Sequence, residues 1–289
     1  MENIIAMNSA DKTENHINIK PLVTIIMGVY NGESTLNQSI SSILDQTYEN
    51  FEFIICDDGS SDNTWKCLEK WKSRDNRIML LKNKINLGAG LARNKCLELA
   101  KGKYVALMDA DDISMPKRIM EQVNFLEQFS EFGFVGTKGE YFTQEIGDLK
   151  QYYWFLAKPC KEDFLMTLPF VHASLMFRID IFRELGGYRD SWTVKRSEDY
   201  DLLLRAYASG VCGANINEPL YGIRLNRDTF QRRKYKYRFL ECIVKWNGFY
   251  HLGLMPLGIV YAVKPLVVGL IPVGFLNKWK SIYYSRKGE

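Results

Sequence analysis

The first half of the chain alternates short apolar runs with amphipathic segments. The runs are rich in β-branched and large aliphatic residues and are too short for helices. Both properties are typical of strands buried on both faces of a sheet. Polar and turn-forming residues separate the runs from the segments that follow. We therefore predict buried strands at 22–27, 51–56, 78–81 and 104–108.

Between these strands, apolar residues recur at the spacing of one helix face. The pattern predicts a helix at 34–46, a second helix after Asp62 and a third that opens at Asn86–Gly90. The resulting β-α-β-α-β-α-β order implies an α/β fold, with a mainly parallel sheet and helices on both faces. Ligands of such sheets bind beyond the carboxyl ends of the strands.

The second half of the chain has a less regular pattern. We predict further strands at 132–136 and 174–177 and a helix that begins at Glu198. Glu198 and Asp199 would occupy the first turn of this helix, where acidic side chains interact favourably with the helix dipole. That structural role is the alternative to a catalytic role for the pair.

Candidate chemistry concentrates where the predicted strands end. Asp109 and Asp111 follow one strand, and side chains two positions apart on an extended chain point the same way. Carboxylates this close repel each other unless a cation lies between them, and Mg²⁺ or Mn²⁺ takes such oxygen ligands together with substrate phosphates. A solvated acidic turn is the alternative. A second acidic strand end, Asp57–Asp58, favours the metal site, because both pairs should share one rim of the sheet with 29–31.

Composition sets limits on the class of protein. A chain of 289 residues with 46% hydrophobic and 25% charged residues suits one large domain, alone or with an appendage. The net charge of +4 is too small to indicate nucleic acid as a partner. No Gly-rich dinucleotide motif and no P-loop motif occurs.

The cysteines and the N-terminus indicate a reducing compartment. None of the six cysteines forms a C-x-x-C pair, so we predict buried thiols and neither a disulfide framework nor a zinc site. Residues 1–20 are polar and lack the apolar core of a signal peptide. We expect them to be a lead-in to a protein that stays in the cytosol or on its membrane face.

The C-terminal region combines a basic collar with an apolar segment. Seven Lys or Arg and one acid lie between Arg224 and Arg238, and Lys264 is the only charged residue in 246–277. Three prolines and the central lysine argue against a single membrane span. We expect an interfacial or re-entrant segment on an anionic membrane surface. A buried helical hairpin that closes the core is the alternative.

Several motifs, in order, resemble those of family 2 glycosyltransferases of the GT-A type, as found in bacterial synthesis of O-antigen, capsule and exopolysaccharide. The resemblance runs from about residue 21 to 224 and implies a Rossmann-like nucleotide-binding sheet. Each motif is weak alone, but their order and spacing are specific. The motifs lie at 23–33, 41–48, 54–62, 86–94, 108–112, 186–189 and 197–201.

The resemblance implies a donor site for a nucleotide sugar, with UDP as the expected nucleotide. Asp57 would accept a hydrogen bond from the uracil N3–H, and Tyr30 and Glu33 would lie along the nucleoside. Asn86 and Gly88 would close over it. The diphosphate and its Mn²⁺ or Mg²⁺ would be held by Asp109 and Asp111.

The resemblance also implies an inverting transfer to an acceptor hydroxyl. Asp199 would be the catalytic base, and Glu198 would orient it or bind the acceptor. His172 matches a histidine often found beside the site in this family, although a single histidine is commonly structural. The expected acceptor is a sugar linked to a polyprenyl diphosphate at the cytoplasmic face of the inner membrane, with the protein bound there peripherally or monotopically.

These expectations divide the chain into three parts. Residues 1–20 are the lead-in, 21–225 form the catalytic domain, and 226–289 form the basic and apolar membrane-associating region. Within the catalytic domain, the nucleotide-sugar half at 21–112 precedes the acceptor half at 113–225. Two rival interpretations are a sugar nucleotidyltransferase, which would need a basic Gly-rich loop after the first strand, and a non-catalytic membrane scaffold that retains the fold.

Overall fold

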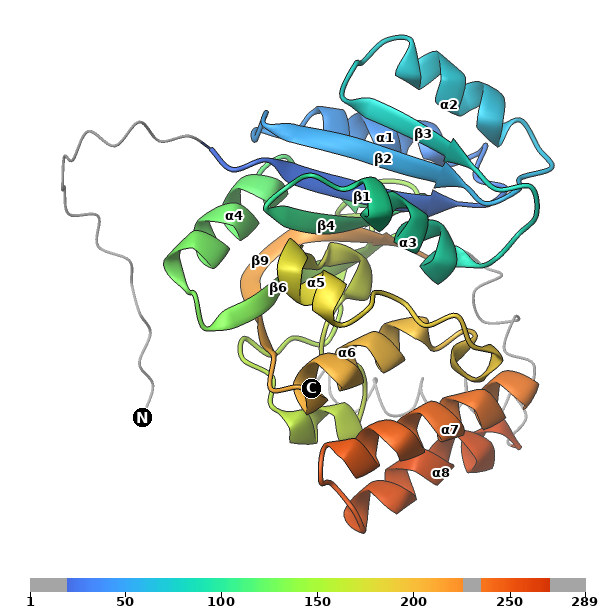
Figure 1. The fold of residues 1–289 in the computed structure, drawn as a ribbon, viewed down its shortest axis with the longest axis vertical. Coiled ribbons are helices and arrows are strands. Elements are labelled where there is room, and N and C mark those ends of the chain that lie inside the picture. Colours follow the sequence, from blue (N-terminus) through green and yellow to red (C-terminus); the bar gives the residue numbers. More distant parts are fainter. Residues whose placement is uncertain (1–19, 226–234, 271–289) are drawn as a thin grey trace, which may run out of the picture.

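One sheet of nine strands runs through the protein, as Figure 1 shows for a computed structural model that describes residues 20–225 and 235–270. Its strand order is β3-β2-β1-β4-β8-β6-β9-β5, with β7 paired to β6. Of the predicted lead-in at 1–20, residues 1–19 lie outside the described residues, as do 226–234 and 271–289. The α/β fold with helices on both faces, predicted from the sequence, is confirmed.

The first half of the sheet is parallel, as predicted. Apolar side chains fill both faces of β1, β2 and β4, which are almost completely buried, whereas the edge strand β3 is only partly buried. A right-handed crossover through a helix is the usual way to join such parallel neighbours. The strands are β1 (Val23–Val29), β2 (Phe51–Asp57), β3 (Ile78–Lys82) and β4 (Tyr104–Asp109).

The second half of the sheet mixes directions. β8 pairs antiparallel with both β4 and β6, β9 runs parallel to β6 with irregular register, and β5 pairs antiparallel with β9. The prediction at 132–136 covers only the start of β6, and β9 was not predicted. These strands are β5 (Ile113–Ser114), β6 (Phe132–Phe142), β7 (Gln151–Tyr152), β8 (Met176–Arg178) and β9 (Cys212–Arg224).

Two apolar clusters lie on opposite faces of the sheet. Helices α1, α2 and α4 pack on one face, and α3, α5 and α6 pack on the other. The helices of the first face are α1 (Leu36–Leu44), α2 (Thr64–Lys72) and α4 (Arg118–Gln128). Those of the second are α3 (Ala89–Leu99), α5 (Ile179–Glu184) and α6 (Glu198–Ala208), with short 3₁₀ turns η1 (Lys161–Leu165), η2 (His172–Ser174) and η3 (Trp192–Val194) nearby.

The C-terminal region contains a helical hairpin that packs against α6. Helix α7 (Tyr235–His251) and helix α8 (Leu257–Gly269) lie side by side below the sheet in Figure 1. Phe249 and Ala262 are fully buried and join the apolar cluster of α3, α5 and α6. The hairpin therefore closes the core, which was the alternative interpretation of this segment.

The outer face of the same hairpin remains apolar and exposed. Val260 is 69% exposed and Val267 is 59% exposed, and Leu257, Trp246 and Tyr250 are also exposed. No helix among residues 20–225 and 235–270 has the length and apolar character needed to cross a bilayer. The predicted domain boundary at 226 falls in a segment outside the described residues, so the three-part division stays a prediction.

Candidate functional site

A cavity of about 1170 Å³ opens beyond the carboxyl ends of β1 and β4. This is the rim on which the sequence places the candidate chemistry. The opposite wall comes from the start of α6 and from both helices of the hairpin. Donor-half residues that line it are Gly28–Gly32, Ser34, Thr35, Asp58, Asn86, Gly88, Ala89, Arg93 and Asp109–Asp111. Acceptor-side residues include Tyr153, Lys195–Tyr200, Tyr237, Arg238, Glu241, Lys245 and Lys264.

An acidic cluster forms where β4 ends. Carboxylate oxygens of Asp109, Asp111 and Asp112 lie within 4.8 Å of one another, a spacing at which one metal ion could bind them all. Burial, and then the charge of Asp109, raises the pKa of the Asp111 carboxyl to about 6. Oxygen-only donors of this kind fit a hard divalent cation such as Mg²⁺ or Mn²⁺.

Two arginines position this cluster. The buried Arg93 of α3 forms an ion pair with Asp109, whose side chain is 35% exposed. The backbone N–H of Arg224 donates to Asp112 Oδ1 at 2.9 Å, and the Arg224 guanidinium donates to the Asp111 carbonyl oxygen at 2.7 Å. The end of β9 thus fixes the turn after β4, while Arg93 reaches the cavity from the opposite face of the sheet.

The two aspartates at the end of β2 have different positions. Asp57 is fully buried; its Oδ1 accepts the Ser60 N–H at 3.0 Å, and its Oδ2 has no partner among the described residues. Asp58 lines the cavity and accepts hydrogen bonds from the Leu87 N–H at 3.0 Å and the Gly88 N–H at 2.7 Å. Asp58 is itself only 2% exposed, so the two aspartates differ in which of them lines the cavity, and the predicted uracil contact of Asp57 stays a prediction.

Among the other predicted donor residues, some line the cavity and one does not. Tyr30, Asn86 and Gly88 line the cavity. Gly88 has a φ of 103°, which a residue with a side chain rarely adopts, and it lets the chain turn into α3. Glu33 does not line the cavity; its carboxylate binds the backbone and side-chain N–H groups of Asn63 at 3.1 and 2.9 Å. In this structure Glu33 joins two loops.

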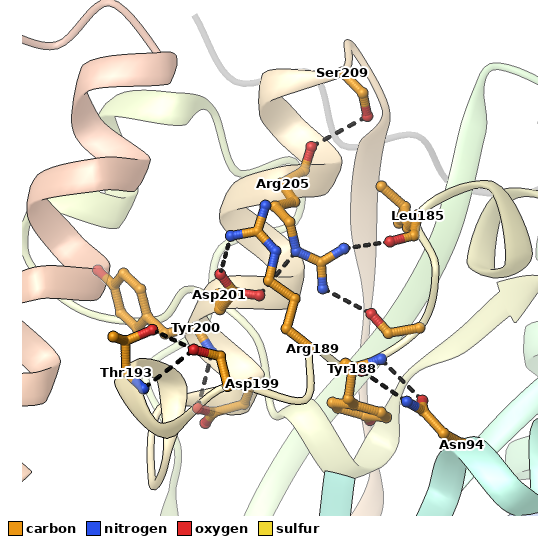
Figure 2. A network of polar contacts seen from close by, with 12 residues as sticks. Asn94, Leu185, Tyr188, Arg189, Thr193, Asp199, Tyr200, Asp201, Arg205 and Ser209 are labelled. Atoms are coloured by element: carbon orange, nitrogen blue, oxygen red, sulfur yellow. Dashed lines mark hydrogen bonds and ion pairs between the residues drawn. The ribbon is translucent and has the colours of Figure 1, made fainter. Parts of the chain in front are cut away.

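Glu198 and Asp199 open α6 and both line the cavity. Figure 2 shows the Asp199 carboxylate accepting the backbone N–H of Tyr200, at 2.8 Å. Burial raises the pKa of Asp199 to about 6, and the neighbouring Glu198 adds to the shift. A carboxylate with a pKa near the working pH is suited to general base chemistry.

A polar network fixes the start of α6 against the donor half (Figure 2). Asp201 lies between Arg189 and Arg205, at 3.1 and 2.8 Å. Arg205 also donates to the carbonyl oxygen of Gly187 at 2.7 Å, and Asn94 of α3 exchanges two hydrogen bonds with the backbone of Tyr188. The motif at 186–189 is therefore held between α3 and α6.

His172 lies behind the cavity wall. Its Nε2 is 2.9 Å from the hydroxyl of Tyr188, and the Tyr188 ring lies 5.7 Å from the guanidinium of Arg93. Burial, reinforced by the charge of Arg93, holds the pKa of His172 well below its usual range. A neutral His172 that supports Tyr188, and through it Arg93, is the role this geometry favours.

Sequence reasoning gave no role to several residues that line the cavity. Asp58 and Arg93 stand inside the recognised motifs, and their positions in those motifs were the available signal. The cavity residues of the hairpin carry no local motif, because they meet the donor half only through the packing of α7 on α6. They are Tyr237, Arg238, Glu241, Lys245, Lys264, Pro265 and Val268.

Comparisons with known proteins agree with this fold and site. The family model described as glycosyl transferase family 2 matches residues 24–186. EpsE of Bacillus subtilis (strain 168) is 36% identical over 275 residues, which cover 94% of this chain and 98% of EpsE. The chain thus belongs to glycosyl transferase family 2 and is a glycosyltransferase.

Two further relatives are informative. The Escherichia coli UDP-Glc:alpha-D-GlcNAc-diphosphoundecaprenol beta-1,3-glucosyltransferase WfaP is 45% identical over 106 residues, which cover 37% of this chain and 41% of WfaP. TarS 1–349 of S. aureus, solved in complex with UDP-GlcNAc, has a TM-score of 0.65 at 17% identity. That alignment covers 84% of this chain and 70% of TarS, and it supports the GT-A fold.

Proposed function

We propose that this glycosyltransferase moves one sugar, with inversion, from a UDP-sugar to a sugar on a lipid-linked diphosphate. The observation that carries the proposal is one cavity lined at one end by Asp58, Asp109 and Asp111 and at the other by Glu198 and Asp199. An anion-binding donor site and a basic carboxylate for the acceptor hydroxyl must face one common space in such a reaction.

On the donor side, we assign the uracil contact to Asp58. Its carboxylate has three hydrogen bonds, from Asn83, Leu87 and Gly88, and retains capacity for a further donor at the cavity surface. Tyr30 and Asn86 would flank the nucleoside from either side. Asp57 and Glu33, which do not line the cavity, would position the loops that carry these contacts.

Asp109 and Asp111 would hold a Mn²⁺ or Mg²⁺ ion at the diphosphate. When bound, such an ion offsets the negative charge that builds up on the departing nucleoside diphosphate. Arg93 would orient Asp109, and Arg224 would fix the backbone of Asp111. Asp112, buried and bound to the backbone of Arg224, would complete the cluster from below.

On the acceptor side, Asp199 would remove the proton from the attacking hydroxyl. The carboxylate must be ionised to do so, and its pKa of about 6 leaves it ionised at neutral pH. Attack on the face opposite the leaving group turns an α-linked donor into a β-linked product. The β-1,3 product in the name of WfaP supports this stereochemistry.

A lipid-linked acceptor would bring the protein to the cytoplasmic face of the inner membrane. The name of WfaP, with a GlcNAc-diphosphoundecaprenol acceptor, supports this class of substrate. The exposed apolar face of α8 would lie in the membrane interface, and basic residues near it would contact anionic lipid headgroups. The function requires only peripheral contact.

The rival functions differ in what they leave unexplained. A sugar nucleotidyltransferase would place cations in the loop after β1, where Val29–Ser34 contains none. A non-catalytic scaffold would have no use for a half-buried Asp199 facing the same cavity as the acidic cluster. Slow hydrolysis of UDP-sugars, measured with Mn²⁺ and with EDTA, separates the three: metal-dependent release of UDP and free sugar is expected. Release of diphosphate, or no release, would contradict the proposal.

A further inference from the structure

The acceptor side of the cavity carries an unusual number of cations. They come from two separate segments, the turn before α6 and the hairpin. Glu241 of α7 pairs with two of them, Arg238 at 3.5 Å and Lys245 at 3.1 Å. The cations that line the cavity here are Lys195, Arg196, Arg238, Lys245 and Lys264.

Three of these cations have no acidic partner within ion-pair distance among residues 20–225 and 235–270: Lys195, Arg196 and Lys264. All three are exposed to solvent at the cavity. The carboxylates of Glu198 and Asp199 line the same cavity but form no ion pair with them in the described part of the chain. Each of these solvent-exposed cations can attract an anionic group that enters this part of the cavity.

Lys264 is the clearest case. It is the only charged residue between Trp246 and Asn277, where every other position is apolar or uncharged. Its helix, α8, presents Lys264 and Val268, one turn apart, to the cavity, while Val260 and Val267 are exposed on the helix surface. Lys264 is thus the one charged side chain that this apolar segment brings to the cavity.

Arg196 is held there at a cost. Its φ of 71° lies in the left-handed region, which is unfavourable for a residue with a side chain. The guanidinium lies 5.9 Å from the ring centre of Tyr237, across the gap between the turn and α7. This strained backbone directly precedes Ser197 and the two cavity carboxylates.

We propose that Arg196, Lys264 and Lys195 form a subsite for the diphosphate of the lipid-linked acceptor. The inference rests on the proposed function and adds the residues that would recognise the acceptor. The subsite joins a cationic wall to the exposed apolar residues at the end of α8, among them Val267 and Leu270. A cationic surface followed by an apolar surface matches a diphosphate attached to a hydrocarbon chain. The donor diphosphate is accounted for at the other end, by the acidic cluster.

The test measures binding without turnover. The full-length protein is saturated with UDP and Mn²⁺, so that the donor site is filled, and titrated with farnesyl diphosphate by calorimetry. Farnesol, which lacks the diphosphate, is the matched probe. The variant combines Arg196→Asn with Lys264→Gln, because asparagine tolerates the left-handed backbone. Lys236→Gln is the control, since Lys236 lies on α7 but does not line the cavity.

The double variant should bind farnesyl diphosphate at least about tenfold more weakly, the scale expected for lost charge-assisted contacts. The wild type should prefer farnesyl diphosphate to farnesol, and the control should match the wild type within about twofold. Equal weakening in Lys236→Gln would indicate general surface charge and overturn the subsite. So would unchanged binding by a folded double variant, with folding judged from its melting temperature.

A transfer assay separates this inference from the proposed function. GlcNAc on an undecyl diphosphate is compared with GlcNAc on undecanol, with a UDP-sugar donor. The double variant should lose at least about tenfold of the wild-type preference for the diphosphate acceptor. If the wild type uses neither acceptor, the proposed function fails, while the binding result still judges the subsite. If the variant keeps the full preference, only the subsite fails.

Discussion

The donor half and the acceptor half of this protein present their charged side chains to the cavity in different ways. In the donor half Asp58 has three hydrogen bonds within the protein, and Glu33 is bound to Asn63. In the acceptor half Arg196 and Lys264 face the cavity without acidic partners in the described residues. On the proposed function, the donor site would be built before its ligand arrives, whereas the acceptor subsite would gain its counter-charge from the ligand.

The difference follows from the elements that carry each site. Donor residues follow the ends of adjacent parallel strands. The hydrogen bonds between these strands therefore fix where the donor residues lie. Acceptor residues come from a turn and two helices that meet only by packing.

The sharpest test of the donor half is the loss of a proposed metal ligand. Asp111→Asn should lower transfer at least about a thousandfold, because charge neutralisation by a bound metal supplies several kcal/mol at the transition state. The fold should persist, since the change removes one of several repelling carboxylates. Turnover with Mn²⁺, with EDTA and in the variant is the measurement. Full activity of the wild type in EDTA would exclude the metal.

On the acceptor side the largest effect should come from Asp199→Asn. We expect kcat to fall about a hundredfold or more, the scale for a general base, with near-normal affinity for the UDP-sugar. With the pKa of Asp199 at about 6, the wild-type rate should fall as the pH drops below 6, because protonation removes the base. The variant should lack the part of that decline that Asp199 causes, while the contribution of Asp111, whose pKa is also about 6, should remain. A collapse of donor affinity with an intact kcat would reassign Asp199 to the donor site.

The pair at the end of β2 tests whether donor contact follows exposure to the cavity. Asp58→Asn should raise the KM for the UDP-sugar about tenfold, through loss of the base contact and of the bonds that hold 87–88. Asp57→Asn should have a smaller effect on KM, since Asp57 does not line the cavity. Steady-state kinetics on both variants decides the order. The reverse order would restore Asp57 as the uracil contact.

The smallest effect concerns the outer face of the hairpin. Val260→Ser combined with Val267→Ser should weaken binding to anionic vesicles several-fold, because less apolar surface enters the interface. Added salt should weaken the binding of the wild type without abolishing it, since salt screens charge but not apolar burial. Vesicle sedimentation measures both. Indifference of the wild type to vesicles would leave the hairpin with only its packing role.

Truncation is a poor test of membrane contact in this protein. Removing 246–289 would delete Phe249, Leu252 and Ala262 from the apolar cluster of α6. We expect the truncated protein to be insoluble, as large cavities in a core cost several kcal/mol. Solubility and full activity of the truncated protein would contradict the packing seen here.

A region of the fold could be predicted from the sequence where local residues determine it, and could not where contacts between distant residues determine it. The strands at 22–27, 51–56, 78–81 and 104–108 were predicted because burial on both faces leaves a continuous apolar run. β9 was not predicted, because its apolar residues are interrupted by Asn217, Glu218 and Pro219. The direction of β8 could not be read from three residues, since pairing depends on distant partners.

The residues of the candidate site also differ in whether a local motif or long-range packing places them. Asp109, Asp111, Glu198 and Asp199 were found from motifs and reach one cavity. The roles given to Asp57 and Glu33 rested on their place in a motif, which does not specify the direction of a side chain at the end of a strand. Lys264 drew attention only as a charge that disfavours a membrane span. Its position at the cavity depends on how α8 packs, which no local pattern encodes.

The continuous sheet has a consequence for how the enzyme exchanges its substrates. Because β4, β8, β6 and β9 join the two halves through one hydrogen-bonded sheet, the parts of the cavity that the sheet carries cannot separate as rigid bodies, whereas the hairpin packs on α6 outside the sheet. Many enzymes release products by such domain opening. In the described part of this chain, any such opening would have to come from the wall outside the sheet, which the hairpin and the turn at Arg196 form.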